Sequence, residues 1–270
     1  MVLFGNNHSS PFRGKMKTQL KTLLASLAIA GVAAMPISAN AANATVGLEL
    51  LLLTDVSGSV SASEYNLQKT GYVNAFQSAA VQNAIAATPG GIAVFYGEWS
   101  GANQQAQKVG WTQITNAAEA NAFASLLAGT TRSFSGNTAP GSALNWATPL
   151  FASNLFDSAR QVIDVSGDGA QNEGDGTATA RNAALAAGVD AINGLPILGE
   201  GGLLNWYTNN IQGGAGAFTL AAADFNSFQT AIEQKLAREI SNNVPERISA
   251  ALVGIGLLGL GLSRRRQNQK

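Results

Sequence analysis

The chain has 270 residues, of which 46% are hydrophobic, so it is long enough to bury the core of one well-packed domain. It contains no cysteine, which excludes disulfides, thiolate metal sites and cysteine nucleophiles. The formal net charge of the whole chain is zero, but residues 42–244 hold 7 basic and 15 acidic side chains, a net charge of 7 − 15 = −8. This negative charge would repel the phosphates of a nucleic acid and argues against nucleic acid as a partner.

Residues 1–41 have the order of a secretory signal: a basic segment, an apolar run at 23–35, and the small-residue sequence Ala39-Asn40-Ala41. We expect cleavage after Ala41, and Met16 is a possible true start. The alternative is a membrane-anchoring helix, for which the apolar run is short. The basic residues of this segment are Lys15, Lys17 and Lys21.

Strand and helix patterns alternate between residues 45 and 240, which predicts an α/β fold with a mainly parallel sheet. Ser61 and Glu64 form a capping box at the start of the first helix, and Asp224 is expected to cap the last one. The predicted strands cover 46–53, 91–98, 109–114, 161–165, a part of 189–198, and 218–220. The predicted helices cover 61–80, 117–127, 141–151, 178–187 and the segment after 224.

The first predicted strand ends in Asp55-Val56-Ser57-Gly58-Ser59. A carboxylate and two hydroxyls alternate there in a tight loop, so all three side chains can point into one small volume. They are hard oxygen donors of the kind that Mg²⁺, Mn²⁺ or Ca²⁺ prefers. The carboxyl end of a strand is also where open α/β sheets place their ligands.

Two further segments carry oxygen-bearing side chains next to predicted helices and strands. Thr138 comes just before a predicted helix, and Asp168 follows a predicted strand and precedes Gly169. Together the three segments resemble the von Willebrand factor type A (VWA) domain and its metal-ion-dependent adhesion site (MIDAS). The resemblance spans residues 45–242 and implies a doubly wound sheet flanked by helices, with a metal site at the carboxyl ends of its strands. The metal ligands that it implies are Asp55, Ser57, Ser59, Thr138 and Asp168.

The same resemblance implies a divalent cation, with Mg²⁺ favoured and Mn²⁺ or Ca²⁺ as alternatives, because three hydroxyls and few charges suit a compact octahedral ion. In that family an acidic side chain of a protein partner completes the coordination. The alternative is that these hydroxyls and acids only cap helices and turns.

A narrower resemblance points to a bacterial branch of these domains that is known only as a domain of unknown function. This second resemblance supports the expected VWA-like fold and implies no biochemical activity. The segments that carry it are 97–101, 162–169, 192–197 and 214–218.

Other acidic residues leave alternatives open. Asp164 lies in an otherwise apolar segment, so it either supports the metal site from behind or forms a salt bridge with Arg160 or Arg181. Glu173 and Asp175 follow in a glycine-rich loop and could bind Ca²⁺, but their spacing fits no EF-hand.

The tail, residues 244–270, has the sequence Val244-Pro245-Glu246, an uncharged run at 248–262, and three arginines from Arg264. It resembles the PEP-CTERM sorting signal of Gram-negative bacteria, which implies processing by an exosortase and transient membrane contact through 248–262. Arg247 stands where that signal usually has proline. The alternative is an ordinary tail anchor. These features imply export to the envelope or surface of a Gram-negative cell.

The single histidine, His8, precedes the expected cleavage site, so residues 42–243 contain neither histidine nor cysteine. This excludes Ser-His-Asp and Cys-His mechanisms and His-ligated zinc. The sequence therefore favours an exported, metal-dependent binding module of the adhesion type. The alternatives are a structural surface or matrix protein with a stabilising metal, and a metal hydrolase that uses Asp55 and Asp168.

Overall fold

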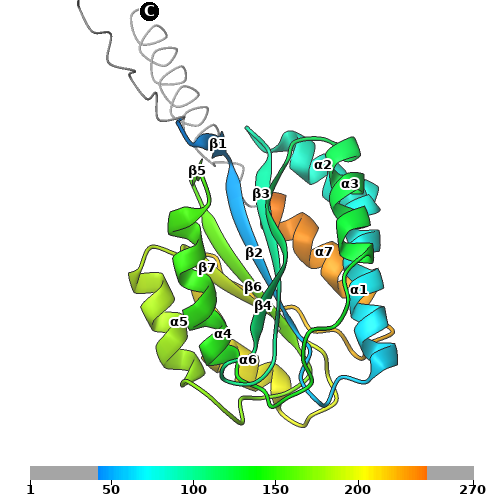
Figure 1. Ribbon diagram of the computed structural model, residues 1–270, viewed down its shortest axis with the longest axis vertical. Helices are drawn as coiled ribbons and strands as arrows, with labels where there is room; N and C mark the ends of the chain where they lie inside the picture. Colours follow the sequence, from blue (N-terminus) through cyan, green and yellow to red (C-terminus); the bar gives the residue numbers. More distant parts are fainter. Residues whose placement is uncertain (1–41, 242–270) are drawn as a thin grey trace, which may run out of the picture. The chain divides into compact units, whose positions relative to one another are not determined.

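The computed structural model describes residues 42–241, and a six-stranded sheet in the order β4-β3-β2-β6-β7-β8 runs through them (Figure 1). The four strands β3, β2, β6 and β7 are parallel to one another, and the edge strands β4 and β8 are antiparallel to their neighbours. A separate pair of short strands, β1 and β5, is parallel. The strands are β1 (Ala44–Val46), β2 (Leu48–Asp55), β3 (Ile92–Trp99), β4 (Gln105–Ile114), β5 (Phe156–Ser158), β6 (Gln161–Gly167), β7 (Ala191–Pro196) and β8 (Gly213–Gly214).

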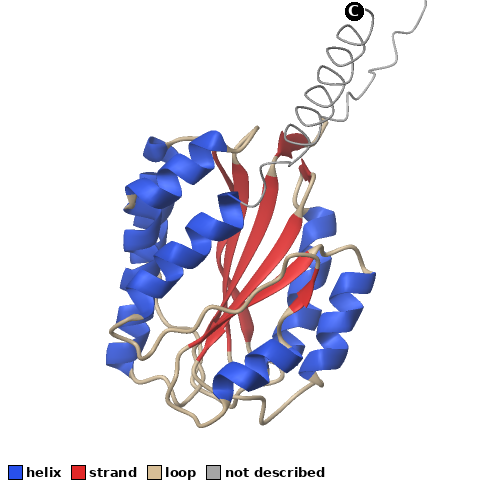
Figure 2. Ribbon diagram, turned by 180° about the vertical axis from the view of Figure 1, so that it is seen from behind, coloured by secondary structure: helices blue, strands red, loops and turns tan. Residues whose placement is uncertain are grey.

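Helices cover both faces of this sheet, as the view from behind shows (Figure 2). One layer consists of α1 (Ala62–Gln77), α2 (Ala79–Ala87), α3 (Ala117–Ala128) and α7 (Phe228–Ser241), which contact one another. The other consists of α4 (Pro140–Ala147), α5 (Thr177–Ala186) and α6 (Leu203–Asn210), and a 3₁₀ helix, Thr148–Ser153, continues α4. The predicted α/β fold with a mainly parallel, doubly covered sheet is confirmed.

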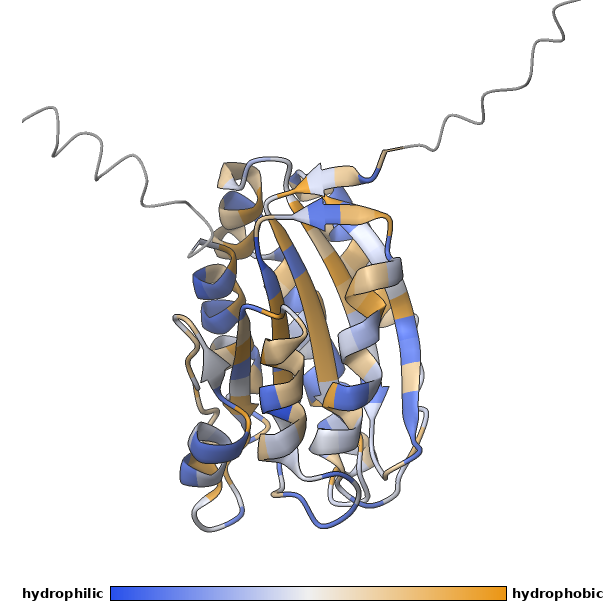
Figure 3. Ribbon diagram, turned by 90° about the vertical axis from the view of Figure 1, so that its left-hand side faces the viewer, coloured by the Kyte–Doolittle hydropathy of each residue, from blue (hydrophilic) through white to orange (hydrophobic). Residues whose placement is uncertain are grey.

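The central strand β2 explains why the sheet is covered on both sides. Its leucines alternate between two hydrophobic cores, with Leu50 and Leu52 facing the α1 layer and Leu51 and Leu53 facing the α4 layer. Every residue of β2 is buried, which is the pattern of a parallel strand covered on both faces. Figure 3 shows hydrophobic colouring along the central strands and a mixture of hydrophobic and hydrophilic residues along the flanking helices.

Several elements of the structure differ from the prediction. Residues 218–220 form no strand and contribute only an isolated bridge between Thr219 and Gly194. Helix α6 was not predicted, and the helix expected over 141–151 changes to a 3₁₀ helix at Thr148. Asp224 closes a turn with Ser227, and helix α7 begins only at Phe228, so Asp224 is not its direct cap.

The two predicted targeting signals, the secretory signal at 1–41 and the sorting segment at 244–270, lie outside the described residues. Between residues 42 and 241, none of the helices has both the length and the apolar character needed to cross a bilayer.

Candidate metal centre

The site begins with the pairing of β2 and β6, two parallel neighbours in the sheet. Thr54 lies opposite Ser166, so both strands end at the same edge. Asp55 is the last residue of β2, and Asp168 directly follows β6. The parallel pairing therefore brings two carboxylates together from positions that are far apart in the sequence.

A chain of hydrogen bonds connects four of the five predicted ligands. The backbone N–H of Ser57 donates to Asp55 Oδ1 over 2.7 Å. The hydroxyls of Ser57 and Ser59 lie 3.1 Å apart, and Ser59 Oγ donates to Asp168 Oδ1 over 2.8 Å. The oxygens of these residues are thus neighbours in space.

Thr138 reaches the same place from the loop before α4. Its N–H donates to Asn172 Oδ1 over 2.8 Å, and its carbonyl accepts from the N–H groups of Asn172 and Glu173. A Cβ placed on Gly169 would lie 3.7 Å from Thr138 Oγ1, so this hydroxyl borders the residue after Asp168. The structure therefore gathers all five predicted residues at one end of the sheet.

The electrostatics of Asp55 suit a bound cation. Its side chain has no exposed surface, and within residues 42–241 its Oδ2 atom has no hydrogen-bond partner. Burial, with the Asp168 charge as a smaller contribution, raises the pKa of Asp55 from 3.8 to about 7. A buried carboxylate oxygen without a partner is costly unless a cation balances it.

Asp168 is half-buried, and burial also raises its pKa above the ordinary value. The nearby charges of Glu64 and Glu200 act in the same direction. The site therefore concentrates negative charge around three neutral hydroxyls. This donor set, all of it oxygen, fits a hard divalent cation.

Gly167 is required by the close packing behind the site. A Cβ at this position would lie 2.7 Å from Asp55 Oδ2 and 2.7 Å from the Tyr207 hydroxyl. Both distances are shorter than any ordinary contact of such an atom. The absence of a side chain at Gly167 thus leaves room for the Asp55 carboxylate at the end of β6.

Arg132 supports the candidate site from outside, and the sequence alone did not point to it. Its Nη2 donates to the carbonyls of Val56 and Ser57 over 2.8 and 2.7 Å, and its Nε donates to the carbonyl of Phe134 over 2.7 Å. The guanidinium therefore fixes the loop that carries Ser57 and Ser59. No spacing signal connects position 132 to this loop, because the contact depends on how the chain returns after α3.

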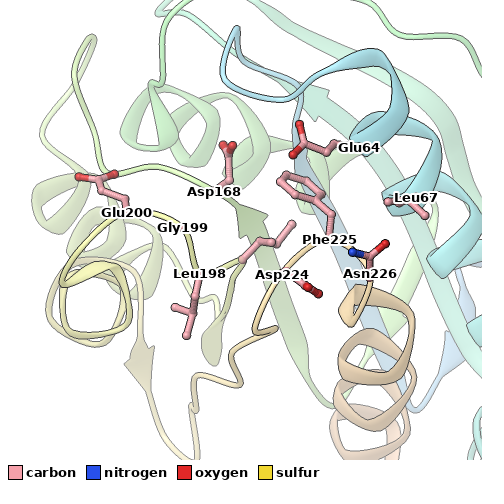
Figure 4. Close-up of a pocket in the computed structure, with 10 residues that line it drawn as sticks. Glu64, Leu67, Asp168, Leu198, Gly199, Glu200, Asp224, Phe225 and Asn226 are labelled. Carbon is pink, nitrogen blue, oxygen red and sulfur yellow. The ribbon is translucent and has the colours of Figure 1, made fainter.

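A cavity of about 420 Å³ opens beside Asp168 (Figure 4). Side chains from the start of α1, the loop after β7 and the turn before α7 surround it. Its lining combines acidic with apolar side chains, among them Glu64, Leu67, Leu198, Glu200, Asp224 and Phe225. The cavity is thus continuous with the candidate metal centre and shares its negative charge.

Three other acidic residues, Asp164, Glu173 and Asp175, have partners within the protein. Asp164 pairs with Lys235, and the predicted pairing with Arg160 or Arg181 is wrong. The carboxylate of Glu173 accepts from the Ala102 N–H, while that of Asp175 accepts from the side chains of Ser142 and Asn145. Both loop acids therefore have protein partners.

Clusters of three or more His, Cys, Asp or Glu side chains placed to hold a metal are absent from residues 42–241. The candidate centre differs from such clusters because hydroxyls supply three of its five side chains.

Comparison with known proteins places the chain in a family. The model of the family described as "Protein of unknown function (DUF1194)" matches residues 45–244. The chain belongs to this family. No curated protein matches it.

Several solved structures share the fold at low sequence identity. One is proximal thread matrix protein 1 from the mussel byssus, described with a zinc-occupied MIDAS motif, at 16% identity and a TM-score of 0.53 over 74% of this chain and 47% of that one. The pilus adhesin SpaC from Lactobacillus rhamnosus GG has 14% identity and a TM-score of 0.54 over 73% and 31%. The PilB minor pilin from Streptococcus sanguinis has 11% identity and a TM-score of 0.51 over 74% and 62%.

These structures have the VWA-like fold, and this DUF1194 protein shares it. In each case the match spans less than two thirds of the other protein's length. The likeness therefore concerns one domain of larger proteins and shows the fold alone.

Proposed function

We propose that this DUF1194 protein is an exported, metal-dependent binding module of the adhesion type. Ser57, Ser59 and Thr138 would hold a divalent cation through their hydroxyls, and Asp55 and Asp168 would supply its negative charge directly or through water. The observation that carries the proposal is the buried Asp55 carboxylate, whose Oδ2 atom has no hydrogen-bond partner among the described residues and whose Oδ1 atom begins the hydrogen-bonded row through Ser57 and Ser59 to Asp168. Mg²⁺ is the expected ion, with Mn²⁺ or Ca²⁺ as alternatives.

The bound ion would act as the acceptor for an acidic side chain of a partner protein. The cavity beside Asp168 is lined by the carboxylates of Glu64, Glu200 and Asp224, which repel an approaching acid. A cation at the site reverses this repulsion locally. Capture of an acidic partner should therefore depend strictly on the ion.

The lining of the cavity further restricts the partner. Leu67, Leu198 and Phe225 offer apolar surface next to the carboxylates. This combination suits a segment in which the acidic residue is followed by a side chain with an apolar stem and a positive head, such as lysine or arginine.

Export is the second part of the proposal. It is supported by the order of basic, apolar and small residues in 1–41 and by the sorting-signal pattern in 244–270. The similar structures are described as a thread matrix protein, a pilus adhesin and a minor pilin. We place the protein in the envelope or on the surface of a Gram-negative cell, with an exosortase as its processing enzyme.

The test is titration calorimetry of residues 42–244 with Mg²⁺, Mn²⁺ and Ca²⁺, followed by titration of the loaded protein with an Asp-Lys peptide. The proposal predicts heat with at least one ion and peptide binding that EDTA abolishes. Asp168→Asn should remove both. Glu173→Gln, which deletes an equal charge five residues later, should retain both.

Two outcomes would contradict the proposal. The absence of heat with all three ions from a folded protein would end the metal assignment. Ion binding that raises stability while partner capture from envelope extract survives EDTA and Asp55→Ala would instead favour a structural matrix protein with a stabilising metal.

A further inference from the structure

A second group of reactive side chains lies in the core, away from the candidate metal centre. Lys235 and Glu239 are one turn apart on α7, and Asp164 faces them from β6. All three side chains have no exposed surface. A fully buried amine between two buried carboxylates is rare in proteins, because each charge loses its hydration.

The distances within this group are short. Lys235 Nζ lies 2.6 Å from Asp164 Oδ1 and 2.5 Å from Glu239 Oε1. The contact with Glu239 is a hydrogen bond, and that with Asp164 is an ion pair. Beyond Lys235, neither oxygen of Asp164 has a hydrogen-bond partner within the described chain. The amine therefore touches both carboxyl groups, and Lys235 is the one cation that faces Asp164 among the described residues.

Glu239 is held in position on its other side. Its Oε1 also accepts from Asn193 Nδ2 over 2.8 Å, and Asn193 Oδ1 in turn accepts from the Phe218 N–H over 2.9 Å. The Phe218 ring lies 5.5 Å from Lys235 Nζ. The surroundings thus fix the Glu239 carboxylate and place an aromatic ring beside the amine.

The protonation states favour a reaction between Lys235 and Asp164. Burial, with the charge of Glu239 as the next contribution, raises the pKa of the Asp164 carboxyl. The Asp164 carboxyl, buried beside a second carboxylate, therefore takes up a proton more readily than an exposed one. A protonated Asp164 is an electrophile that an amine can attack, and Glu239 is the base that can free that amine.

We propose that the folded protein joins Lys235 Nζ to Asp164 Cγ through an amide bond, with Glu239 transferring the protons. Glu239 Oε1 first accepts one proton from the ammonium. The free amine then forms the N–C bond, the bond between Cγ and the hydroxyl breaks, and the hydroxyl leaves as water with a second proton from the nitrogen. One proton stays on the amide nitrogen and one on Glu239, so atoms and charges balance without a further reactant.

Two physical effects favour this condensation inside the core. The fold holds amine and carboxyl in contact, which replaces a bimolecular encounter by a reaction between fixed neighbours. The product contains an uncharged amide and an uncharged Glu239 in place of a buried ion pair, so the desolvation cost of two charges disappears. The amide would tie α7 to the centre of the sheet.

The test is digestion of the denatured full chain with a protease that cleaves after glutamate, followed by mass spectrometry. Asp164 then lies in the fragment 120–173 and Lys235 in the fragment 234–239. These fragments are not adjacent in the sequence, so only the proposed bond can join them. We expect one joined species whose mass is the sum of both fragments minus one water molecule. Recovery of both fragments separately, at their calculated masses, would overturn the proposal.

Two variants test the roles within the group. Lys235→Met keeps an apolar side chain of similar length without the amine, and its fragments should always separate. Glu239→Gln keeps both reacting groups, and the joined species should form about 100-fold more slowly or not at all. Its second fragment then extends to Glu246. Joining at the rate of the unmodified protein would show that Glu239 has no part in the reaction.

Discussion

At the scale of single residues, the candidate metal centre depends on one side chain that lies outside it. Arg132 holds the carbonyls of Val56 and Ser57 and so sets the path of the loop that presents Ser57 and Ser59. Residues that position ligands in this way commonly affect metal affinity about 10- to 100-fold. We therefore expect the affinity of the proposed site for an ion to depend on Arg132 as well as on the hydroxyls.

Arg132→Ala should weaken cation binding about 10-fold or more, because the loop that carries Ser57 and Ser59 loses the two hydrogen bonds that fix its carbonyls. Calorimetric titration with the preferred ion measures the effect. The matched control is Arg181→Ala, since Arg181 also donates to two carbonyls, those of Asn209 and Gln212, but away from the site. Equal affinities for all three proteins would show that the loop needs no support from Arg132.

A buried acid at the opposite end of β2 gives a prediction on pH. Glu49 has no exposed surface, and burial raises its pKa above 4.5 although Asn154 and Gln161 donate to it. The folded state therefore holds this proton more tightly than the unfolded state does. The resulting stabilisation is present below pH 4.5 and is lost as the pH rises through the folded-state pKa.

Glu49→Gln removes this titration, so its free energy of unfolding should fall less than that of the parent protein between about pH 5 and about pH 8. The variant should be less stable at low pH, since glutamine leaves one of the two donors without an acceptor. Urea unfolding at several pH values measures both slopes. The two proteins share all other titrating groups. If the free energy of unfolding changed equally with pH in both, the raised pKa of Glu49 would be contradicted.

At the scale of elements, the sequence predicted the strands and helices that carry regular apolar patterns. The buried run from Leu50 to Leu53 and the capping box of Ser61 and Glu64 appear in the structure as expected. Helix α6 was missed for a physical reason. It starts after Gly202, whose φ of 81° is left-handed and whose lack of a side chain leaves no capping signal. Glycine-rich segments on both sides of α6 favoured the prediction of a loop over that of a short helix.

The candidate site could be predicted to a similar extent. The five candidate ligands follow a pattern of residue types, so Asp55, Ser59 and Asp168 were identified from the sequence and lie together in the structure. Arg132 and the pairing of Asp164 with Lys235 were not, because they depend on distances between elements that no local pattern contains.

The packing of α1 against α7 gives a prediction for an element contact. A Cβ at Gly71 would lie 2.7 Å from Phe228 Cδ1 and 3.3 Å from the Cα of Gln229, so a larger residue must push the helices apart. Gly71→Val should lower the free energy of unfolding by about 1–3 kcal/mol, as overpacking usually does. Gly199→Val is the control, since a Cβ there meets nothing within 4 Å and should change stability by less than about 0.5 kcal/mol. Equal stabilities in chemical denaturation would contradict the close contact.

At the scale of the whole molecule, the fold and the charge distribution act together. A VWA-like sheet places hydroxyls and carboxylates at one edge, and residues 42–244 carry a net charge of −8. The same fold occurs in proteins with other roles, so function has to be argued from the site itself. A net negative charge attracts cations in general, and the proposal assigns one of them to the row of hydroxyls at Ser57, Ser59 and Thr138.

The measurement that tests the central claim most directly is an anomalous difference map from crystals of the protein soaked in Mn²⁺. The account predicts one strong peak within bonding distance of the Ser57, Ser59 and Thr138 hydroxyls, next to Asp168. The peak should be lost in Asp168→Asn and kept in Glu173→Gln. Well-ordered loops without a peak at this position, or a peak held only by surface carboxylates elsewhere, would contradict the account.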